Sequence, residues 1–301
     1  MKTILIGLSI VIMTASLTYA GGKTPEFSIG ARNVSLANAN ISESSDVSAM
    51  YENPAAIGFL ENSSIFINHS QEYGPGGMEE DIAIPLVLKS PVVFAVGLDS
   101  YHFGYLSQTS PASQRVFEYG YDMAFASTIT PTVSIGGSAS LRHGTTGTGS
   151  QAWGAYFSVG ADYAPTPDLS YSIVLGGLGR DVSYFAGDSG MAATGQLLPR
   201  TLEIGATMTY PSSASLLPPL FILSFANEKI FGVGGVYYKG GIEIRPVQFI
   251  ALRFGYMAGP NLASARYGLG FIGKFFSLQY AVYPSPETHA LLQQFSLSME
   301  F

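Results

Sequence analysis

The sequence predicts an all-β protein: a transmembrane, antiparallel, up-and-down β-barrel of about 14 strands with an N-terminal plug. Three observations lead to this prediction. The composition is apolar, although no run of residues is long enough for a spanning helix. Apolar and polar residues alternate with a period of two after Ser63, and short and long breaks take turns along the chain.

Residues 1–20 have the layout of a cleavable secretory signal peptide. Lys2 is followed by an apolar run from Ile4 to Met13 and then by Thr18-Tyr19-Ala20, after which cleavage is expected. A single-helix anchor is the alternative, but this run has about ten residues and a spanning helix needs about 20. We therefore expect an exported protein.

The composition agrees with a barrel in lipid. The chain is 47% hydrophobic and 12% charged, whereas soluble domains are about 25% charged. A lipid-facing Lys or Arg at the bilayer midplane costs about 2–4 kcal/mol, so a low charge content is expected. The chain has no cysteine, and its net charge of −7 argues against nucleic acid as a partner.

Residues 21–62 lack a clear strand pattern. They contain polar clusters, a short helix-like stretch near Ser35 to Ala39, and the sequence Asn53-Pro54-Ala55. Such a long segment without strands is better buried than left free. We predict a plug or hatch over residues 21–62, with a periplasmic tail as the alternative, and a barrel over residues 63–301.

The strand pattern is clearest at the C-terminus. Phe295, Leu297, Met299 and Phe301 alternate with polar residues, and Thr201 to Tyr210 and Phe117 to Phe125 alternate in the same way. A soluble sandwich would also alternate, with its apolar side inward. The low charge and the export signal favour an apolar side that faces lipid.

The breaks between strands fall into two classes. Short breaks are expected at Lys89-Ser90-Pro91, Thr130-Pro131, Pro165-Thr166-Pro167, Pro211-Ser212, Arg245-Pro246 and Lys274. Longer breaks lie between them, at Gly74 to Gly77, Ser107 to Gln114, Gly144 to Ser150, Ala186 to Leu197, Asn227 to Gly232, Ala258 to Ser264 and Pro284 to His289. Short periplasmic turns and longer external loops are typical of outer-membrane barrels.

Charged residues in the strands fall on the polar phase of the alternation. Since charges cannot face lipid cheaply, we expect them to line the lumen and to pair with the plug residues Arg32, Glu43, Asp46 and Glu52. The set is Asp99, Glu118, Asp122, Arg142, Asp162, Glu203, Glu243, Arg245 and Arg253.

Four other patterns have simple structural interpretations. Gly268-Leu269-Gly270-Phe271-Ile272-Gly273 matches a dinucleotide-binding pattern but lies in an alternating strand, where glycines permit close approach of the plug. Glu79-Glu80-Asp81 could bind calcium, although a solvated loop edge is the simpler interpretation, so no metal site is assigned. No nucleophile motif surrounds His69, His102, His143 or His289. Several aromatic residues are expected at the membrane interfaces, namely Tyr119, Tyr121, Tyr163, Tyr210, Tyr256, Tyr280 and Phe301.

Two motifs resemble a known family. Gly30-Ala31-Arg32, followed by Asn53-Pro54-Ala55, resembles the N-terminal hatch signature of FadL-like barrels. The C-terminal half resembles the PorV/PorQ branch, in Leu198-Pro199-Arg200, Gly241-Ile242-Glu243, the run Ala251 to Tyr256, and His289. A terminal Phe301 resembles the general signal read by the outer-membrane assembly machinery.

The resemblance implies a non-enzymatic outer-membrane protein of a Gram-negative-type bacterium, without a cofactor. PorV/PorQ resemblance implies a role in protein export or surface attachment by type IX secretion. FadL resemblance implies, as the alternative, a channel for hydrophobic small molecules. The expected partners are outer-membrane lipid, the assembly machinery, and either secretion-system components or a hydrophobic ligand.

Overall fold

The computed structural model describes residues 28–43, 46–72, 77–88, 91–103, 116–146, 151–185, 192–196, 200–211, 221–232, 234–260, 262–284 and 291–301. Fifteen strands follow three short helices along these residues. The helices are α1 (Ala31–Ser35), α2 (Ala49–Glu52) and the 3-10 helix η1 (Ala56–Phe59). In these ranges no helix has the length and apolar character that a membrane crossing requires.

The first strands are β1 (Ser64–Glu72), β2 (Gly77–Val87), β3 (Val92–Phe103), β4 (Val116–Thr130), β5 (Val133–Thr146), β6 (Gln151–Thr166), β7 (Leu169–Phe185) and β8 (Ala192–Gln196). The remaining strands are β9 (Thr201–Tyr210), β10 (Phe221–Ile230), β11 (Tyr237–Val247), β12 (Ile250–Gly259), β13 (Leu262–Ile272), β14 (Phe276–Pro284) and β15 (Leu291–Glu300).

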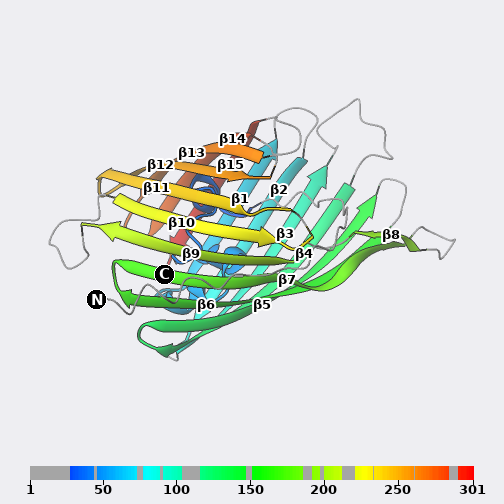
Figure 1. Cartoon of the computed structure of the whole chain (residues 1–301), viewed down its shortest axis with the longest axis horizontal. Coiled ribbons are helices and arrows are strands. Elements are labelled where there is room, and N and C mark those ends of the chain that lie inside the picture. Colours follow the sequence, from blue (N-terminus) through cyan, green and yellow to red (C-terminus); the bar gives the residue numbers. More distant parts are fainter. Residues whose placement is uncertain are drawn as a thin grey trace.

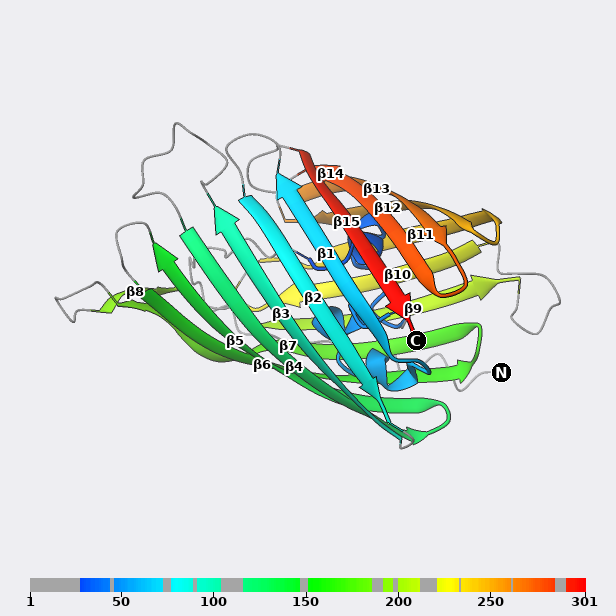
Figure 2. The same cartoon turned by 180° about the vertical axis from the view of Figure 1, so that it is seen from behind.

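The strands close into one antiparallel barrel (Figures 1 and 2). Consecutive strands pair from β1 to β7 and from β9 to β15, β7 pairs with β9, and β1 pairs with β15. β8 pairs only with the end of β7, so fourteen of the fifteen strands form the ring. The predicted antiparallel β-barrel and its strand number are confirmed. β8 is an addition inside the predicted break at Ala186 to Leu197.

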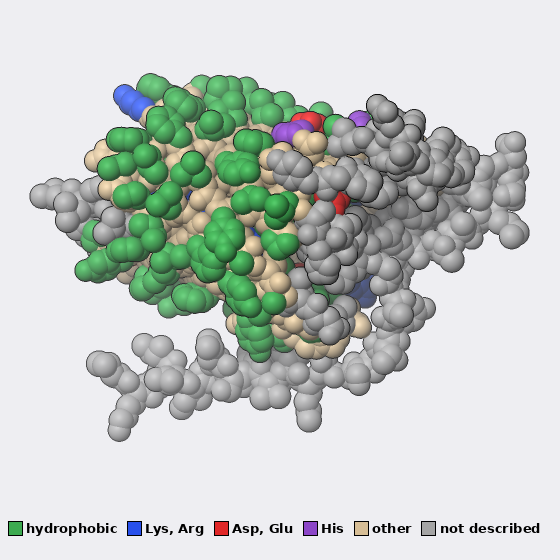
Figure 3. All heavy atoms as spheres, turned by 90° about the horizontal axis from the view of Figure 1, so that it is seen from above, with side chains coloured by type: hydrophobic (Ala, Val, Ile, Leu, Met, Phe, Trp, Pro, Cys, Tyr) green, Lys and Arg blue, Asp and Glu red, His purple; other side chains and the backbone are tan. Residues whose placement is uncertain are grey.

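The outer surface of the barrel is apolar. On β12, Leu252, Phe254 and Tyr256 are each more than 40% exposed, whereas Arg253 between them is 4% exposed. The other strands alternate in the same way. In Figure 3, hydrophobic side chains cover much of the part of the barrel surface that is not drawn in grey. An apolar outer band around a polar interior is the pattern of a transmembrane barrel, which places the protein in the outer membrane.

Most breaks lie near their predicted positions, but three differ. The break predicted at Asn227 to Gly232 lies later in the chain, because β10 continues to Ile230 and β11 begins at Tyr237. The expected turn at Arg245-Pro246 lies inside β11, which continues to Val247 with a register shift between Ile244 and Val247. Proline has no N–H for the strand ladder, so it is accommodated at a bulge as well as in a turn. The predicted break from Ala258 to Ser264 is shorter, because β12 ends at Gly259 and β13 begins at Leu262.

Candidate functional site

The described part of the N-terminal segment, residues 28–43 and 46–62, packs between the strands of the barrel. α1 packs against β12, β13, β14 and β15, while η1 packs against β3, β4, β5 and β6 on the opposite side. Figures 1 and 2 both show these coils, in blue, between the two walls. The segment therefore spans the lumen from one wall to the other.

The Gly30-Ala31-Arg32 motif begins α1 and joins it to the wall. Gly30 has φ +104°, a conformation that favours glycine, and its carbonyl oxygen accepts the first helical hydrogen bond from Val34 N at 3.0 Å. The Ala31 amide donates to Ser296 Oγ on β15 at 2.7 Å. The motif thus fixes the start of the helix and its distance from the wall.

Asn53-Pro54-Ala55 forms a compact turn against the opposite wall. Asn53 Nδ2 donates to the Ile41 carbonyl at 2.9 Å and to Asp162 Oδ1 at 3.1 Å, and Asn53 Oδ1 accepts from Ala55 N at 3.0 Å. A Cβ at Gly136 on β5 would lie 2.5 Å from the Pro54 carbonyl oxygen. A larger residue at Gly136 would push this turn off the wall.

The glycine pattern from Gly268 to Gly273 lies in and just after β13, with no helix behind it. A Cβ built on Gly268 would meet the Ser35 side chain of α1. The glycine therefore allows the N-terminal segment to approach the wall, and the sequence around it lacks the strand-to-helix context of a dinucleotide site.

A buried ion cluster joins α1 to β11 and β12. Glu243 is 0% exposed and accepts from Arg32 Nε at 2.9 Å, Arg253 Nε at 2.6 Å and Arg245 Nη2 at 2.6 Å. Arg32 also pairs with Glu43 of the segment at 2.8 Å. Through Arg32, this cluster links the segment to the wall, and removing one partner of such a cluster leaves buried charge uncompensated.

A second cluster contains residues that the sequence did not single out. Lys239 on β11 pairs with Glu203 at 2.8 Å and with Glu228 at 3.0 Å, and Arg266 on β13 is 5% exposed. Only Glu203 was predicted. Lys239 and Arg266 occupy the inward phase of their strands, so the alternation could have identified them.

A third group lies on β2 to β5. Asp99 and Asp122 are buried, and both contact Arg142, which also donates to the Tyr156 hydroxyl at 3.0 Å. Glu118 is half-buried on β4. All nine predicted wall charges therefore lie on buried or half-buried inward positions of the strands.

The predicted partners in the segment behave differently. All three acids of the segment accept a hydrogen bond from the segment itself. Glu43 accepts from Arg32, Asp46 from the Ser48 amide, and Glu52 from the Ser28 hydroxyl at 2.5 Å. Arg32 is the segment charge that forms a described ion pair with the wall. The short segment folds back on itself, so its own groups satisfy most of its acids.

Glu79-Glu80-Asp81 does not form a solvated loop edge. The three residues lie in β2, with Glu79 6% and Asp81 3% exposed and Glu80 on the outer face. Glu80 pairs there with His69 Nδ1 at 2.7 Å. The loop-edge interpretation is wrong, because strand alternation separates the three side chains to two faces.

The other two described histidines pack against aromatic rings. His102 lies 4.7 Å from Phe117, and His143 lies 4.1 Å from Trp153, between ring centroids. His289 and Leu198-Pro199 lie outside the described residues. Of the predicted interface aromatics, Tyr280 is half-buried; Tyr119, Tyr121, Tyr163, Tyr210, Tyr256 and Phe301 are exposed.

One part of the lumen is apolar. Val47, Met50 and Ile57 of the segment pack against a patch of apolar, mostly small side chains on β1 to β4. The wall side of this apolar cluster consists of Phe66, Ala83, Val93, Ala95, Ala124 and Ala126. The Tyr51 ring packs against this cluster. Its hydroxyl points to Gly97 on β3, between the cluster and the buried acids Asp99 and Asp122.

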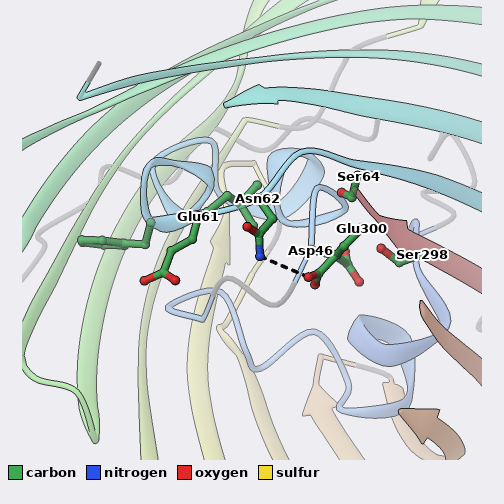
Figure 4. Close-up of a pocket in the computed structure, with 8 residues that line it drawn as sticks. Asp46, Glu61, Asn62, Ser64, Ser298 and Glu300 are labelled. Carbon is green, nitrogen blue, oxygen red and sulfur yellow. Dashed lines mark hydrogen bonds between the residues drawn. The ribbon is translucent and has the colours of Figure 1, made fainter. Parts of the chain in front are cut away.

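A small pocket lies where the segment meets the start of β1 and the end of β15 (Figure 4). Its volume is about 230 Å³, and Asp46, Glu61, Asn62 and Glu300 contribute to its lining. Asn62 Nδ2 donates to Glu300 Oε2 at 3.2 Å. The pocket is smaller than sites for drug-sized ligands, which occupy about 300–1,000 Å³, and its acids make it unsuitable for an apolar compound.

Fold and lumen together define a transmembrane β-barrel with an N-terminal segment packed between its walls. No protein-family model and no curated protein matches the sequence. Among solved structures, the Pseudomonas putida toluene transporter TodX is similar, with a TM-score of 0.64 and 11% identity over 95% of this chain and 99% of that one.

Two further structures have the same fold. A Pseudomonas aeruginosa FadL homologue has a TM-score of 0.63 and 10% identity, over 94% of this chain and 99% of that one. The Ralstonia pickettii toluene transporter TbuX has a TM-score of 0.58 and 13% identity, over 93% of this chain and 96% of that one. The predicted FadL-like fold is confirmed. Nothing in these comparisons supports the predicted PorV/PorQ role in type IX secretion, and the alternative prediction agrees with them better.

Proposed function

We propose that this protein is a FadL-like outer-membrane channel for small hydrophobic compounds, in which residues 28–62 act as a movable plug. The observation that carries the proposal is the apolar cluster between Met50, Ile57 and the inner faces of β1 to β4. It offers an apolar compound a water-free environment inside a lumen that is elsewhere charged.

The β1–β2 ladder beside this cluster is shorter than the two strands. The β1–β2 ladder ends at the pair Phe66 and Ala83, both of which belong to the cluster, although β2 continues to Val87. Pro85 has no N–H to donate to a ladder. A lateral route for an apolar compound is therefore most easily opened at this place.

The polar part of the lumen restricts the mechanism. The segment contacts both walls, and buried charges line the described strands. An apolar compound does not pass through such a polar interior without a large desolvation cost. Transport consequently requires the segment to move away from β1 to β4.

Whole-cell uptake of radiolabelled toluene tests the proposal, in cells whose outer membrane carries the protein or lacks it. We compare Ala95→Leu, which fills the apolar cluster, with Ala281→Leu, which fills a separate buried cluster on the other wall. Both substitutions overpack the interior by a similar volume. We expect the protein to increase uptake, Ala95→Leu to reduce it several-fold, and Ala281→Leu to leave it unchanged.

Equal uptake with and without the folded protein would contradict the proposal. A parallel deletion, followed by analysis of the secreted and surface-attached proteins, separates it from a role in export. The channel proposal predicts that these proteins are unchanged.

A further inference from the structure

Four buried carboxylates from three neighbouring strands face the lumen next to the apolar cluster. Glu79 and Asp81 lie on β2, Asp99 on β3 and Asp122 on β4, and each is at most 6% exposed. Asp81 is directly opposite Asp99 in the strand register. Like charges in this position repel each other, so the group needs a source of neutralisation.

The protein itself supplies only part of that neutralisation. Asn68 Nδ2 donates to Asp81 Oδ2 at 2.7 Å, and Arg142 donates to Asp99 Oδ1. Four buried oxygens have no partner among the described residues: Glu79 Oε2, Asp81 Oδ1, Asp99 Oδ2 and Asp122 Oδ2. Buried carboxylate oxygens left in this state are costly, and Arg142 is one cation for four acids.

Three of these carboxylates converge. Glu79, Asp81 and Asp99 each place a carboxylate oxygen so that all three lie within 4.8 Å of one another. The N-terminal segment contributes a further unpartnered group nearby. The Tyr51 hydroxyl is buried and has no hydrogen-bond partner among the described residues. It reaches Gly97, which is paired in register with Asp122.

We propose that Glu79, Asp81 and Asp99 form a binding site for a hard divalent cation, Ca²⁺ foremost, inside the barrel. Calcium accepts six to eight oxygen ligands at about 2.3–2.6 Å in irregular geometry, and it takes water for the ligands the protein lacks. Magnesium requires a near-ideal octahedron, and softer metals prefer nitrogen or sulfur. The Tyr51 hydroxyl is placed to hydrogen-bond to a water on the cation, which would couple the site to the segment.

Calorimetric titration of the EDTA-treated full chain in detergent with CaCl₂ tests this site. We compare the wild type with Asp81→Asn and with Glu80→Gln, a neighbour on β2 that faces outward. We expect one Ca²⁺ per wild-type chain, at least tenfold weaker binding by Asp81→Asn, and unchanged binding by Glu80→Gln. Because Asp81→Asn removes a buried charge, we also expect it to raise the melting temperature in the absence of Ca²⁺.

A second measurement needs no variant. Tb³⁺ bound at the site would be excited through Tyr51, and Ca²⁺ would displace it with loss of luminescence. Absence of Ca²⁺ binding by the wild type at millimolar concentration would overturn the proposal and would mean that protons neutralise the group. Equal Ca²⁺ affinity of the wild type, Asp81→Asn and Glu79→Gln would also overturn it. These outcomes do not depend on transport.

Discussion

At the scale of single residues, Glu243 links the N-terminal segment to the wall through an ion pair. It is fully buried and is surrounded by Arg32, Arg245 and Arg253. The attraction among these groups offsets the cost of removing them from water only while the carboxylate is present.

Glu243→Gln should therefore be strongly destabilising. It leaves three guanidinium groups around a neutral side chain, and we expect a loss of about 3–5 kcal/mol in the free energy of unfolding. Urea unfolding in detergent micelles measures it. The matched variant Glu61→Gln, at an exposed position of the segment, should change stability by less than about 0.5 kcal/mol. Equal stability of Glu243→Gln and the wild type would contradict this account of the cluster.

Arg32→Met distinguishes the stability of the N-terminal segment from that of the barrel wall. Glu243 keeps Arg245 and Arg253 in this variant, so the wall should stay folded, while α1 loses its ion pairs with Glu243 and Glu43. We expect faster amide hydrogen exchange in residues 28–43 and unchanged exchange in β11 and β12. Faster exchange throughout the barrel would show that Arg32 stabilises the wall instead.

At the scale of elements, the alternation of apolar and polar residues along each strand could be predicted, because one face of the strand contacts lipid and the other contacts the polar lumen. Residues such as Leu252, Arg253 and Phe254 therefore alternate as expected. The bulge at Ile244 to Val247 could not be predicted, because Pro246 is compatible with either a turn or an edge irregularity.

The helices of the segment were harder to predict. α1 covers Ala31–Ser35, several residues before the helix-like stretch expected near Ser35 to Ala39. A helix this short is not stable by itself, so contacts with β12 to β15 determine its position. Those contacts join residues far apart in sequence, so they cannot be predicted from a local sequence pattern.

Helix α2 carries an acid whose ionisation should affect stability. Burial raises the pKa of Glu52 above its ordinary value, despite the hydrogen bond from Ser28. The folded chain then binds a proton more tightly than the unfolded chain, so this group costs stability as the pH rises from its ordinary pKa through its folded pKa. We expect Glu52→Gln to stabilise the protein at neutral pH.

The gain should vanish in acid. Below the ordinary pKa of glutamate, about 4.3, Glu52 is protonated in both the folded and unfolded chains, so the variant and the wild type should have equal stability there. Urea unfolding at neutral pH and at pH values below this pKa checks both parts, with Glu61→Gln as the exposed control. A variant that is less stable than the wild type at neutral pH would contradict the prediction.

At the scale of the whole molecule, the barrel inverts the arrangement of a soluble protein. Large apolar side chains such as Phe225, which is 62% exposed, cover the outside, and most charges face the lumen. Phe225 lies near the middle of β10 and Phe231 follows its end. The two positions provide a test of the membrane orientation.

Phe225→Arg should destabilise the protein by about 2–4 kcal/mol in a bilayer, because it places a charge near the hydrocarbon midplane. Phe231→Arg should cost about 0–1 kcal/mol, since it lies near the interface. Chemical unfolding of the protein in liposomes measures both. Equal effects at the two positions would show that the apolar belt does not face hydrocarbon.

The closed fold could be predicted from the sequence, whereas most of the chemistry of the lumen could not. The inward charges were identifiable one by one from the strand phase, as Asp162 and Glu243 show. Their pairing depends on the barrel register, which brings Glu243 on β11 opposite Arg253 on β12. Glu79 and Asp81 were assigned to a loop and Asp99 to the lumen, so their convergence on one place was not predicted; β2 continues through the stretch that resembles a loop.

The central claim is that the segment must leave β1 to β4 for a hydrophobic compound to pass, and a reversible disulfide tests it most directly. The chain has no cysteine. A Cβ on Gly58 of η1 would lie 3.2 Å from Ser134 Cβ on β5, close to the spacing of about 3.5–4.5 Å in disulfides. In Gly58→Cys/Ser134→Cys we expect toluene uptake to be lost on oxidation and restored by reductant, with no redox effect in either single variant. Equal uptake by the oxidised and reduced double variant, with the disulfide verified by mass spectrometry, would contradict the claim.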